Sequence, residues 1–505
     1  MSCILGITLT GVFAIQALYQ ITFHPLTSVP GPKICAIARM PYFYDCSRGL
    51  DVFWIDGLHQ KNGPIVRFGP RDISFASAKA WKSVNGFVKN KRENDKALEF
   101  FIPPVNGAHS ILTANFEDHA RVRRLFSPAF SESAILTQQQ PLLKKDTNLF
   151  LSKLRELSKD GDPVEMTSMF NFVTFDIANE LAFGQELRQL EIGKYLPWVA
   201  TVFDQLRNLP IMSMIAYYPV LTGLLSVFEP KWIKKKRREH CAFSEGIVRK
   251  QVQEGSAHEF DLVRVVLNKF DPIMSILILN LNFRWRLVLK DMTIEEMNSN
   301  AEFFVIAGSE TIATHLSGAI FYLLKNPQCL HRLTQEIRSS FSTLEAMTCE
   351  TLAQQPYLNT VIKESMRIFP SVGVGSPRVV GPDPQTIMGY TFPPGTRVST
   401  RHYATYHSAA NFRDPECSSP ERNREEAEYY ANDVRDAHQP FSVGPRAFQE
   451  QTFAQHEARM LLAALVHAFD LELCPSSADW DKRLRCCALL DKGAIYCRLR
   501  DAAAR

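Results

Sequence analysis

No Asp, Glu, Lys or Arg side chain precedes Lys33 in this chain. A cleaved secretory signal peptide normally starts with a positively charged segment and ends at a small-residue cleavage site, and neither is evident here. The 11 cysteines contain no Cys-x-x-Cys pair, which favours reduced thiols facing the cytosol over a disulfide framework. The net charge of +4 is spread along the chain, so it gives no sign of a nucleic-acid-binding surface.

The N-terminus instead contains about 20 mostly apolar residues, enough for a helix to cross a bilayer. We therefore predict a transmembrane anchor over residues 1–22. Residues 23–35 carry Pro30 and Pro32, and they form a stiff hinge because proline lacks an amide donor and fixes its own backbone angle. Residues 36–505 make up the globular part, and a hydrophobic content of 46% is enough for one large core.

A long helix is predicted to begin at Thr293 and to end at Pro327. Thr293 and Glu296 have the spacing of a capping box, and the proline cannot continue the helix. The segment Ala-Gly-Ser-Glu-Thr at residues 307–311 lies inside it, where a glycine costs about 1 kcal/mol relative to alanine. The glycine therefore needs a reason, and for this segment taken alone that reason is a helix kink with an exposed Glu and Thr.

Two pairs of charged residues have helical spacing. Glu364 and Arg367 are three residues apart and share one helix face, a pattern that is common on protein surfaces. His119 and Arg123 are four residues apart in an arginine-rich segment. This second pair fits either an anion-binding site or a solvated basic face.

The segment Phe-Ser-Val-Gly-Pro-Arg at residues 441–446 is a loop that leads into an amphipathic helix. Together with residues 307–311 and the Glu-x-x-Arg at 364–367, in this order, the loop resembles the cytochrome P-450 superfamily of haem-thiolate monooxygenases. The surrounding sequence is most similar to fungal members that oxidise hydrophobic secondary metabolites. The resemblance covers about residues 20–500.

This resemblance implies a mainly α-helical fold with a minor β-sheet region, in which a triangular helical domain surrounds a long central helix. It implies haem as the cofactor, NADPH-cytochrome reductase as the electron donor and a hydrophobic small molecule as the substrate. It further implies a single membrane pass in the endoplasmic reticulum, with residues 36–505 in the cytosol.

The resemblance also implies roles for individual residues. It assigns oxygen activation to Glu310 and Thr311. It assigns contacts with the haem propionates to His119, Arg123, Arg378 and Arg446. It places Glu364, Arg367 and Arg422 in one buried network, which is tolerable only because the charges are paired. Ser418 and Asn423 stand beside this network where the family has aromatic residues, so the packing there departs from the pattern.

The family pattern Phe-x-x-Gly-x-Arg-x-Cys-x-Gly is broken at its iron-binding end. Phe448 occupies the position of the cysteine, and Glu450 occupies that of the closing glycine. Haem iron in this family takes a thiolate ligand, and a phenyl ring has no lone pair to offer. A glycine would let the backbone approach the macrocycle, whereas Glu450 adds bulk and negative charge. We therefore expect that haem is lost or weakly bound and that the chain supplies no metal ligand at this position.

Residues 263–290 form an apolar, β-rich stretch where the family has a short polar link into its longest helix. We interpret this stretch either as a buried insertion or as retained intron sequence. An exposed apolar strand of this kind would favour aggregation.

Three functions follow from these observations. The first is an inactive homologue that keeps the fold but performs no monooxygenation, and we favour it because of Phe448. The second is an active monooxygenase, which requires a corrected gene or a replacement ligand such as Cys417, Cys474 or His456. The third is a membrane-bound partner of pathway enzymes without catalysis of its own.

Overall fold

The computed structural model describes residues 2–87, 93–101, 104, 106–218, 220–223, 245–249, 262–267, 292–424, 428–487 and 489–502. The predicted insertion at 263–290 falls largely outside this part of the chain, since residues 268–290 are not described. Its interpretation therefore stays a prediction.

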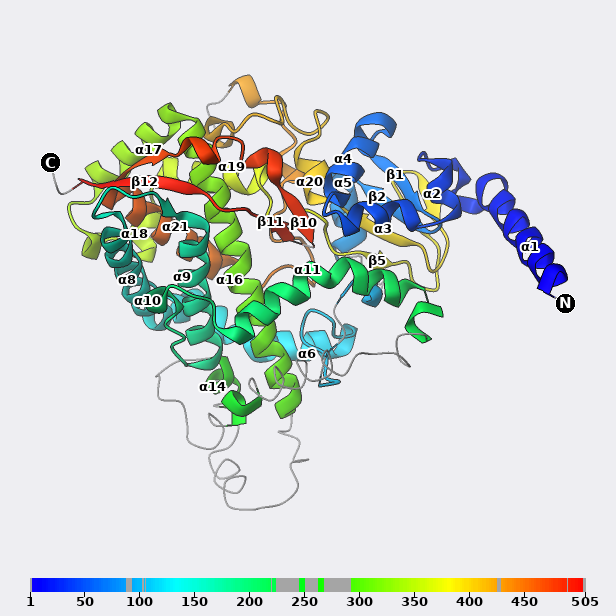
Figure 1. The fold of residues 1–505 in the computed structure, drawn as a ribbon, viewed down its shortest axis with the longest axis horizontal. Coiled ribbons are helices and arrows are strands. Elements are labelled where there is room, and N and C mark those ends of the chain that lie inside the picture. The colour runs from blue at the N-terminus through cyan, green and yellow to red at the C-terminus, as the bar shows by residue number, and fades with distance from the viewer. Residues whose placement is uncertain are drawn as a thin grey trace, which may run out of the picture.

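The central element is helix α16 (Ile294–Lys325), which runs through the middle of the molecule (Figure 1). The predicted capping box is confirmed: the Thr293 hydroxyl accepts the Glu296 N–H at 3.1 Å, and the Glu296 carboxylate accepts the Thr293 N–H at 2.8 Å. The helix ends before Pro327, where α17 (Pro327–Ser340) begins. Most of α16 is buried, so apolar packing adds to the stability that its cap provides.

Several helices pack around α16 and form the main hydrophobic core. Helix α9 (Met166–Phe183) lies along it and is buried on almost every side. Its other neighbours include α19 (Pro356–Ile368) and α21 (Gln451–Ala468), with α8 (Gln140–Ser158) and α18 (Cys349–Ala353) in the next layer. The remaining α-helices are α2 (Lys33–Ile37), α3 (Met40–Ser47), α4 (Asp51–Asn62), α5 (Ala78–Asn85), α6 (Phe116–Phe126), α7 (Glu132–Ala134), α10 (Gln189–Ile192), α11 (Pro197–Tyr217), α14 (Leu262–Leu267) and α20 (His402–Tyr406).

The strands form small sheets at the edges of the helical body. The largest has the order β1-β2-β8-β5-β3, with β1 (Ile65–Gly69), β2 (Asp72–Phe75), β8 (Arg397–Thr400), β5 (Arg378–Val379) and β3 (Asp95–Lys96). Strands β2 and β8 pair in parallel, and the other pairs are antiparallel.

Three smaller sheets complete the β structure. They are β6 (Gln385–Ile387) with β7 (Tyr390–Phe392), β10 (Arg485–Cys487) with β11 (Leu489–Asp491), and β4 (Val164–Glu165) with β12 (Tyr496–Asp501) and β9 (Phe469–Leu473). Strands β7 and β8 lie on either side of Gly395 in the chain but belong to different sheets. The fold is therefore mainly helical with minor sheets, as the resemblance implies.

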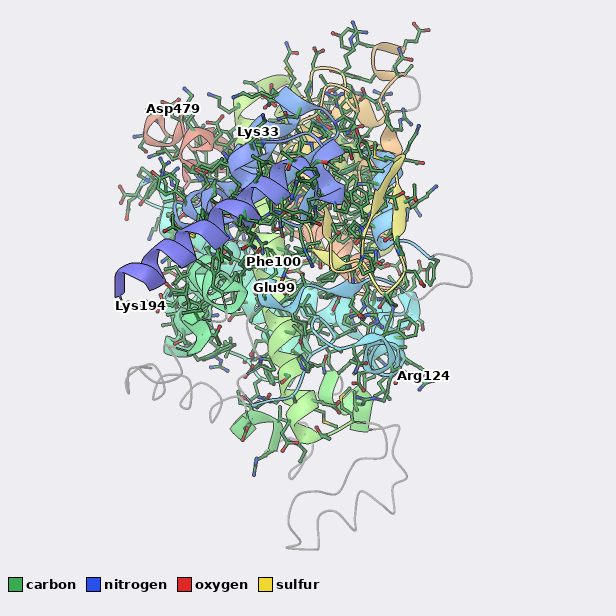
Figure 2. All side chains as sticks on the ribbon, turned by 90° about the vertical axis from the view of Figure 1, so that its right-hand side faces the viewer. Lys33, Glu99, Phe100, Arg124, Lys194 and Asp479 are labelled. Atoms are coloured by element: carbon green, nitrogen blue, oxygen red, sulfur yellow. The ribbon has the colours of Figure 1, made fainter. Side chains whose placement is uncertain are left out.

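Helix α1 (Ser2–Thr22) covers the predicted anchor and projects from the body at the end opposite the C-terminus (Figure 1). Figure 2 looks at this end, with α1 nearest the viewer and Lys33 where the chain joins the body. Apolar side chains such as Phe13 and Leu18 are exposed on it. Within the described residues, the helix that is long and apolar enough to span a membrane is α16, yet 78% of its apolar window is buried inside the protein. Helix α16 is therefore a core helix, and the anchor at 1–22 stays a prediction.

Two glycines of α16 provide a matched test of its packing. A methyl group added at Gly318 would lie 2.3 Å from a ring carbon of Phe369, whereas one added at Gly308 would meet the Ala178 side chain at an ordinary 3.5 Å. We expect Gly318→Ala to lower the free energy of unfolding by about 1–3 kcal/mol because it overpacks the core. Gly308→Ala should leave it unchanged or raise it by about 1 kcal/mol, through helix propensity. Urea unfolding followed by tryptophan fluorescence measures both, and equal effects of the two changes would contradict this account.

Candidate active site

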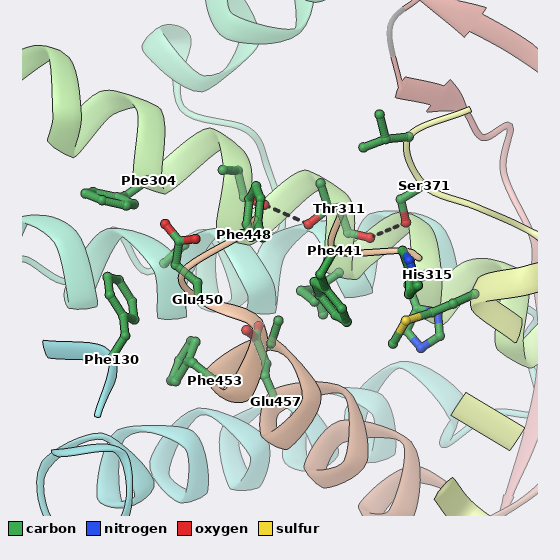
Figure 3. Close-up of a pocket in the computed structure, with 18 of the residues that line it drawn as sticks. Phe130, Phe304, Thr311, His315, Ser371, Phe441, Phe448, Glu450, Phe453 and Glu457 are labelled. Carbon is green, nitrogen blue, oxygen red and sulfur yellow. Dashed lines mark hydrogen bonds between the residues drawn. The ribbon is translucent and has the colours of Figure 1, made fainter. Parts of the chain in front are cut away.

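One face of α16 borders a cavity of about 950 Å³, counting the open solvent at its mouth (Figure 3). The helix contributes Gly308, Thr311 and His315, and the opposite wall comes from the loop at 440–450 and the start of α21. Much of the lining is aromatic, with the rings of Phe130, Phe304, Phe441, Phe448 and Phe453. A largely apolar cavity with a few polar groups is typical of a small-molecule site.

The two motif residues of α16 face different surroundings. Thr311 lines the cavity, and its hydroxyl donates to the Ala307 carbonyl at 2.7 Å within the helix. Glu310 does not line this cavity; its buried carboxylate forms an ion pair with Lys492 at 2.7 Å. Burial raises the pKa of Glu310, and the Lys492 ammonium opposes that shift. The structure thus does not bring the predicted proton-relay pair to the same cavity.

Contacts within the chain define the shape of the loop at 441–450. The Phe448 N–H donates to the Phe441 carbonyl at 2.9 Å and closes the loop, so that the Phe448 ring becomes part of the cavity wall. Gly444 has a φ of +84°, and a Cβ there would lie 2.1 Å from the Asn85 carbonyl oxygen. Only glycine fits this position, because it tolerates both the left-handed backbone and the close approach.

Glu450 directly precedes α21 and lines the same cavity, with only 9% of the residue exposed. Its side chain makes no capping hydrogen bond to the helix. Burial raises the pKa of Glu450 to about 7, and the positive charge of Arg123 opposes this shift. Glu450 therefore introduces a carboxyl group that is partly neutral at physiological pH.

The four residues assigned to the propionates gather beside this loop. Arg446 forms an ion pair with Glu93 at 2.6 Å and donates to the Ala114 carbonyl at 2.8 Å. Arg123 donates to the Ala447 carbonyl at 2.6 Å and so ties α6 to the loop. Arg378, on β5, is buried and lies near Arg446.

The electrostatics of this group show an excess of positive charge. Burial and then Arg446 lower the pKa of Arg378 to about 10, and burial, Arg446 and Lys96 lower the pKa of His119 to about 3. Burial and neighbouring arginines also lower the pKa of Lys96 far below its ordinary value. The buried Nη1 atom of Arg378 has no hydrogen-bond partner among the described residues. Lys96 was missed by the sequence analysis because no motif surrounds it.

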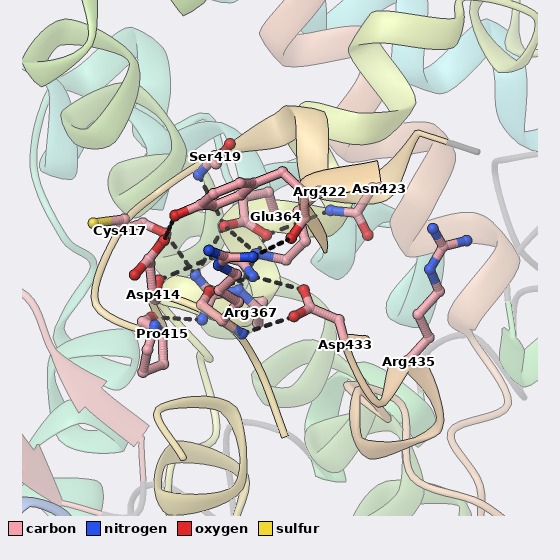
Figure 4. Close-up of polar contacts among 12 residues, drawn as sticks. Glu364, Arg367, Asp414, Pro415, Cys417, Ser419, Arg422, Asn423, Asp433 and Arg435 are labelled. Atoms are coloured by element: carbon pink, nitrogen blue, oxygen red, sulfur yellow. Dashed lines mark hydrogen bonds and ion pairs between the residues drawn. The ribbon is translucent and has the colours of Figure 1, made fainter. Parts of the chain in front are cut away.

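The structure also brings Glu364, Arg367 and Arg422 together in a buried network (Figure 4). The Glu364 carboxylate lies 2.8 Å from Arg367 and 3.4 Å from Arg422. Asp433, which the sequence analysis missed, pairs with Arg422 at 2.6 Å. Backbone carbonyls accept the remaining arginine donors, from Arg413, Asp414, Pro415, Cys417 and Tyr406. The Asn423 amide reaches Glu364 at 3.4 Å, so this departure from the family pattern takes part in the network.

Comparisons with known proteins show the family to which this chain belongs. The family model for cytochrome P450 matches residues 52–498. The chain is a member of the cytochrome P450 family. The cytochrome P450 monooxygenase efuB of Hormonema carpetanum is 37% identical over 92% of this chain and 90% of that protein. The cytochrome P450 monooxygenase astJ of Aspergillus oryzae is 35% identical over 96% of this chain and 94% of that protein.

A solved structure supports the fold. The crystal structure of a cytochrome P450 (CYP102L1) aligns with a TM-score of 0.72 and covers 89% of this chain and 94% of that one. Its sequence identity of 18% carries the likeness of fold and nothing finer. Mainly helical architecture around α16 is thus the cytochrome P450 fold.

The family implies haem, and the residues here fit one end of that group but not the other. The basic cluster, which consists of Lys96, Arg123, Arg378 and Arg446, fits the group. Its buried positive charge and the unpartnered Nη1 atom of Arg378 suit the two propionates of haem. The iron end does not fit: Phe448 stands in the ligand position, and no cysteine is among the described residues that line the cavity. Cys417, Cys474 and His456 are absent from that lining as well, which disfavours them as replacement ligands.

Removing the shared acid tests the buried network. Glu364→Gln removes the carboxylate that pairs with Arg367 and leaves Arg422 with Asp433 alone. We therefore expect the free energy of unfolding to fall by about 3–5 kcal/mol. Glu421→Gln is the matched control, because Glu421 is next to Arg422 in the chain but its side chain is more than one-third exposed. Urea unfolding of both variants makes the comparison. Equal stabilities would show that the network contributes nothing.

The buried carboxyl of Glu450 makes stability depend on pH. Its pKa is about 7 in the fold against an ordinary 4.5, so the folded chain binds more protons in this window and its stability falls as pH rises from 4.5 to 7. Glu450→Gln removes this loss. We expect the variant to gain about 3 kcal/mol over the parent at about pH 8 relative to about pH 4. Urea unfolding at both pH values measures the gain, and an identical pH dependence of variant and parent would contradict it.

Proposed function

We propose that this chain is a cytochrome P450 of fungal secondary metabolism that has lost monooxygenase activity, because it does not form a haem-thiolate centre. The proposal rests on Phe448, whose ring lines the cavity in place of the thiolate ligand. A thiolate pushes electron density onto the iron and favours O–O cleavage, and no described residue of the cavity supplies one. The chain keeps the apolar cavity itself, so binding of a hydrophobic small molecule is compatible with the loss of chemistry.

The basic cluster favours a second candidate, in which haem binds through its propionates without a thiolate on the iron. Arg123, Arg378 and Arg446 would then hold the propionates, and the redox chemistry of haem would be available to electrons from an NADPH-cytochrome reductase. The proton-handling residues weigh against monooxygenation in this case too, since the Glu310 carboxylate is paired with Lys492 away from the cavity. This candidate predicts a haem protein with altered ligation.

Restoring the loop separates the two candidates. We expect the parent chain, purified from membranes, to show no thiolate-type Soret band in a reduced carbon monoxide difference spectrum. The double variant Phe448→Cys with Glu450→Gly should show that band, because it returns both the ligand and the space beside it. Haem content is measured on the same samples as the pyridine haemochrome.

The single changes are the matched controls. Phe448→Cys alone tests whether the carboxyl of Glu450 obstructs the site, and Glu450→Gly alone should bind no thiolate-ligated haem. A thiolate-type band in the parent chain would refute the proposal. Haem in the parent without that band would support the second candidate.

We also propose that α1 anchors the chain in the endoplasmic reticulum membrane, with the helical body in the cytosol. Support comes from its helical form over Ser2–Thr22, its projection from the body and its exposed apolar side chains. The stiff break at Pro30 and Pro32 would separate anchor from body. Residues 1–22, fused to a fluorescent protein, should localise to that membrane, and a cytosolic fusion would refute the anchor.

A further inference from the structure

A second cavity, of about 1020 Å³ counting the open solvent at its mouth, lies against a different part of α16. Its walls come from β4, α9, α11, α16 and the segment around β11. It shares no lining residue with the cavity beside Phe448, which we call the aromatic cavity. Glu310 belongs to this second cavity. The family comparison assigns nothing to it.

Three side chains in this cavity each make a hydrogen bond through one polar atom, while a second atom, an oxygen, has no partner among the described residues. The Glu165 carboxylate accepts the Ser168 N–H at 2.9 Å through Oε2, and the Asn171 amide donates to the Tyr195 hydroxyl at 2.7 Å. Glu310 accepts from Lys492 at 2.7 Å through Oε1. The remaining oxygens, which are Glu165 Oε1, Asn171 Oδ1 and Glu310 Oε2, are buried and have no hydrogen-bond partner among the described residues.

Unsatisfied buried acceptors are rare, and each one costs about 1–3 kcal/mol. Asn171 is 6% exposed and Glu310 is 7% exposed, whereas Glu165 is half-buried. Three such atoms from three different elements line one cavity, which indicates a site built to receive hydrogen-bond donors. Because the held end of each side chain fixes its orientation, the acceptors are arranged before a ligand arrives.

The Tyr195 hydroxyl links the three acceptors. It accepts the Asn171 amide, and its pKa is raised to about 12 by burial first, with both Glu310 and Glu165 adding to the shift. Both carboxylates therefore act on the same hydroxyl. Tyr195 and the three side chains all line this cavity.

The charge of the lining selects a cation. Carboxylates contribute Glu165, Asp204, Glu310 and Asp491, against the two cations Arg207 and Lys492. Lys492 is already paired with Glu310, and Arg207 lies 4.0 Å from Asp491 at the exposed rim. An ammonium group carries only donors, so it satisfies free acceptors and balances the excess negative charge.

The rest of the wall suits an organic body. The rings of Tyr195 and Phe203 line the cavity with their centroids 5.1 Å apart in an edge-to-face arrangement. Aromatic faces attract a cation as well as apolar groups. Leu206 and Leu490 add aliphatic surface. The ligand that matches this lining has both an ammonium head and an apolar part.

We propose that the second cavity binds a small organic amine in its protonated form, with the ammonium group at Glu165, Asn171 and Glu310 and the apolar part against Tyr195 and Phe203. This site goes beyond the proposed function and does not depend on haem. It stands whether or not the aromatic cavity holds a cofactor.

Isothermal titration calorimetry on the full chain in detergent tests the proposal with three probes of one size. Phenethylamine is expected to bind, phenylethanol to bind at least about tenfold more weakly because it lacks the charge, and phenylpropanoate not to bind. Absence of phenethylamine binding overturns the proposal, since the cavity then holds only water. Equal binding of the amine and the alcohol also overturns it.

Variants locate the binding. Glu310→Gln and Asn171→Leu should each weaken phenethylamine binding about tenfold, because each removes a charge or an acceptor that the ammonium uses. Asn171→Asp should strengthen it, because it adds a carboxylate. Glu472→Gln on β9 is the matched control, since it removes one exposed charge elsewhere and should change nothing.

Far-ultraviolet circular dichroism and thermal unfolding check that each variant folds. If Glu310→Gln and Asn171→Leu fold and bind the amine as the parent does, the site is refuted. If both fail to fold, Asn171→Asp decides: tighter binding supports the site, and unchanged or weaker binding refutes it. Haem content of the same samples is recorded, so that a result on the proposed loss of haem is read separately.

Discussion

Burying an ionised side chain costs several kcal/mol unless an opposite charge and hydrogen bonds accompany it, and this constraint organises the interior of the molecule. The network of Glu364, Arg367 and Arg422 satisfies it completely, because carboxylates and backbone carbonyls accept the arginine donors around it. A network in which every buried charge is paired in this way has a structural role. It joins α19 to the irregular chain that leads toward the cavity loop, and so helps to fix that loop independently of any cofactor.

Two other groups satisfy the constraint only in part. The basic cluster around Arg378 has more cations than counter-charges, and the second cavity has buried acceptors without donors. Incomplete pairing of this kind stabilises a fold only when something outside the chain completes it. The two groups have opposite signs, the first suited to an anion and the second to a cation. None of Lys96, Arg123, Arg378 and Arg446 lines the second cavity.

Contacts within the chain shape the loop at 441–450. Backbone hydrogen bonds and the close approach of Gly444 to Asn85 hold the turn. The Phe448 ring forms part of an aromatic wall. Fold and chemistry are therefore separable here, because the fold depends on burial and backbone geometry whereas the chemistry depends on a single side-chain atom.

The sequence by itself determined the family and the long helix from its cap at Thr293 to Pro327, and it puts Phe448 where the resemblance leads us to expect a cysteine. Each of these depends on residue identity at a fixed spacing, and such local information is readable without coordinates. Only the tertiary structure decided that Glu310 pairs with Lys492 and does not line the aromatic cavity beside Thr311. It also decided that Lys96 and Asp433 lie beside charged residues from distant segments. Those outcomes depend on which segments pack together across hundreds of residues. No local pattern encodes such contacts, because many partners for a charged side chain are equally compatible with the sequence around it.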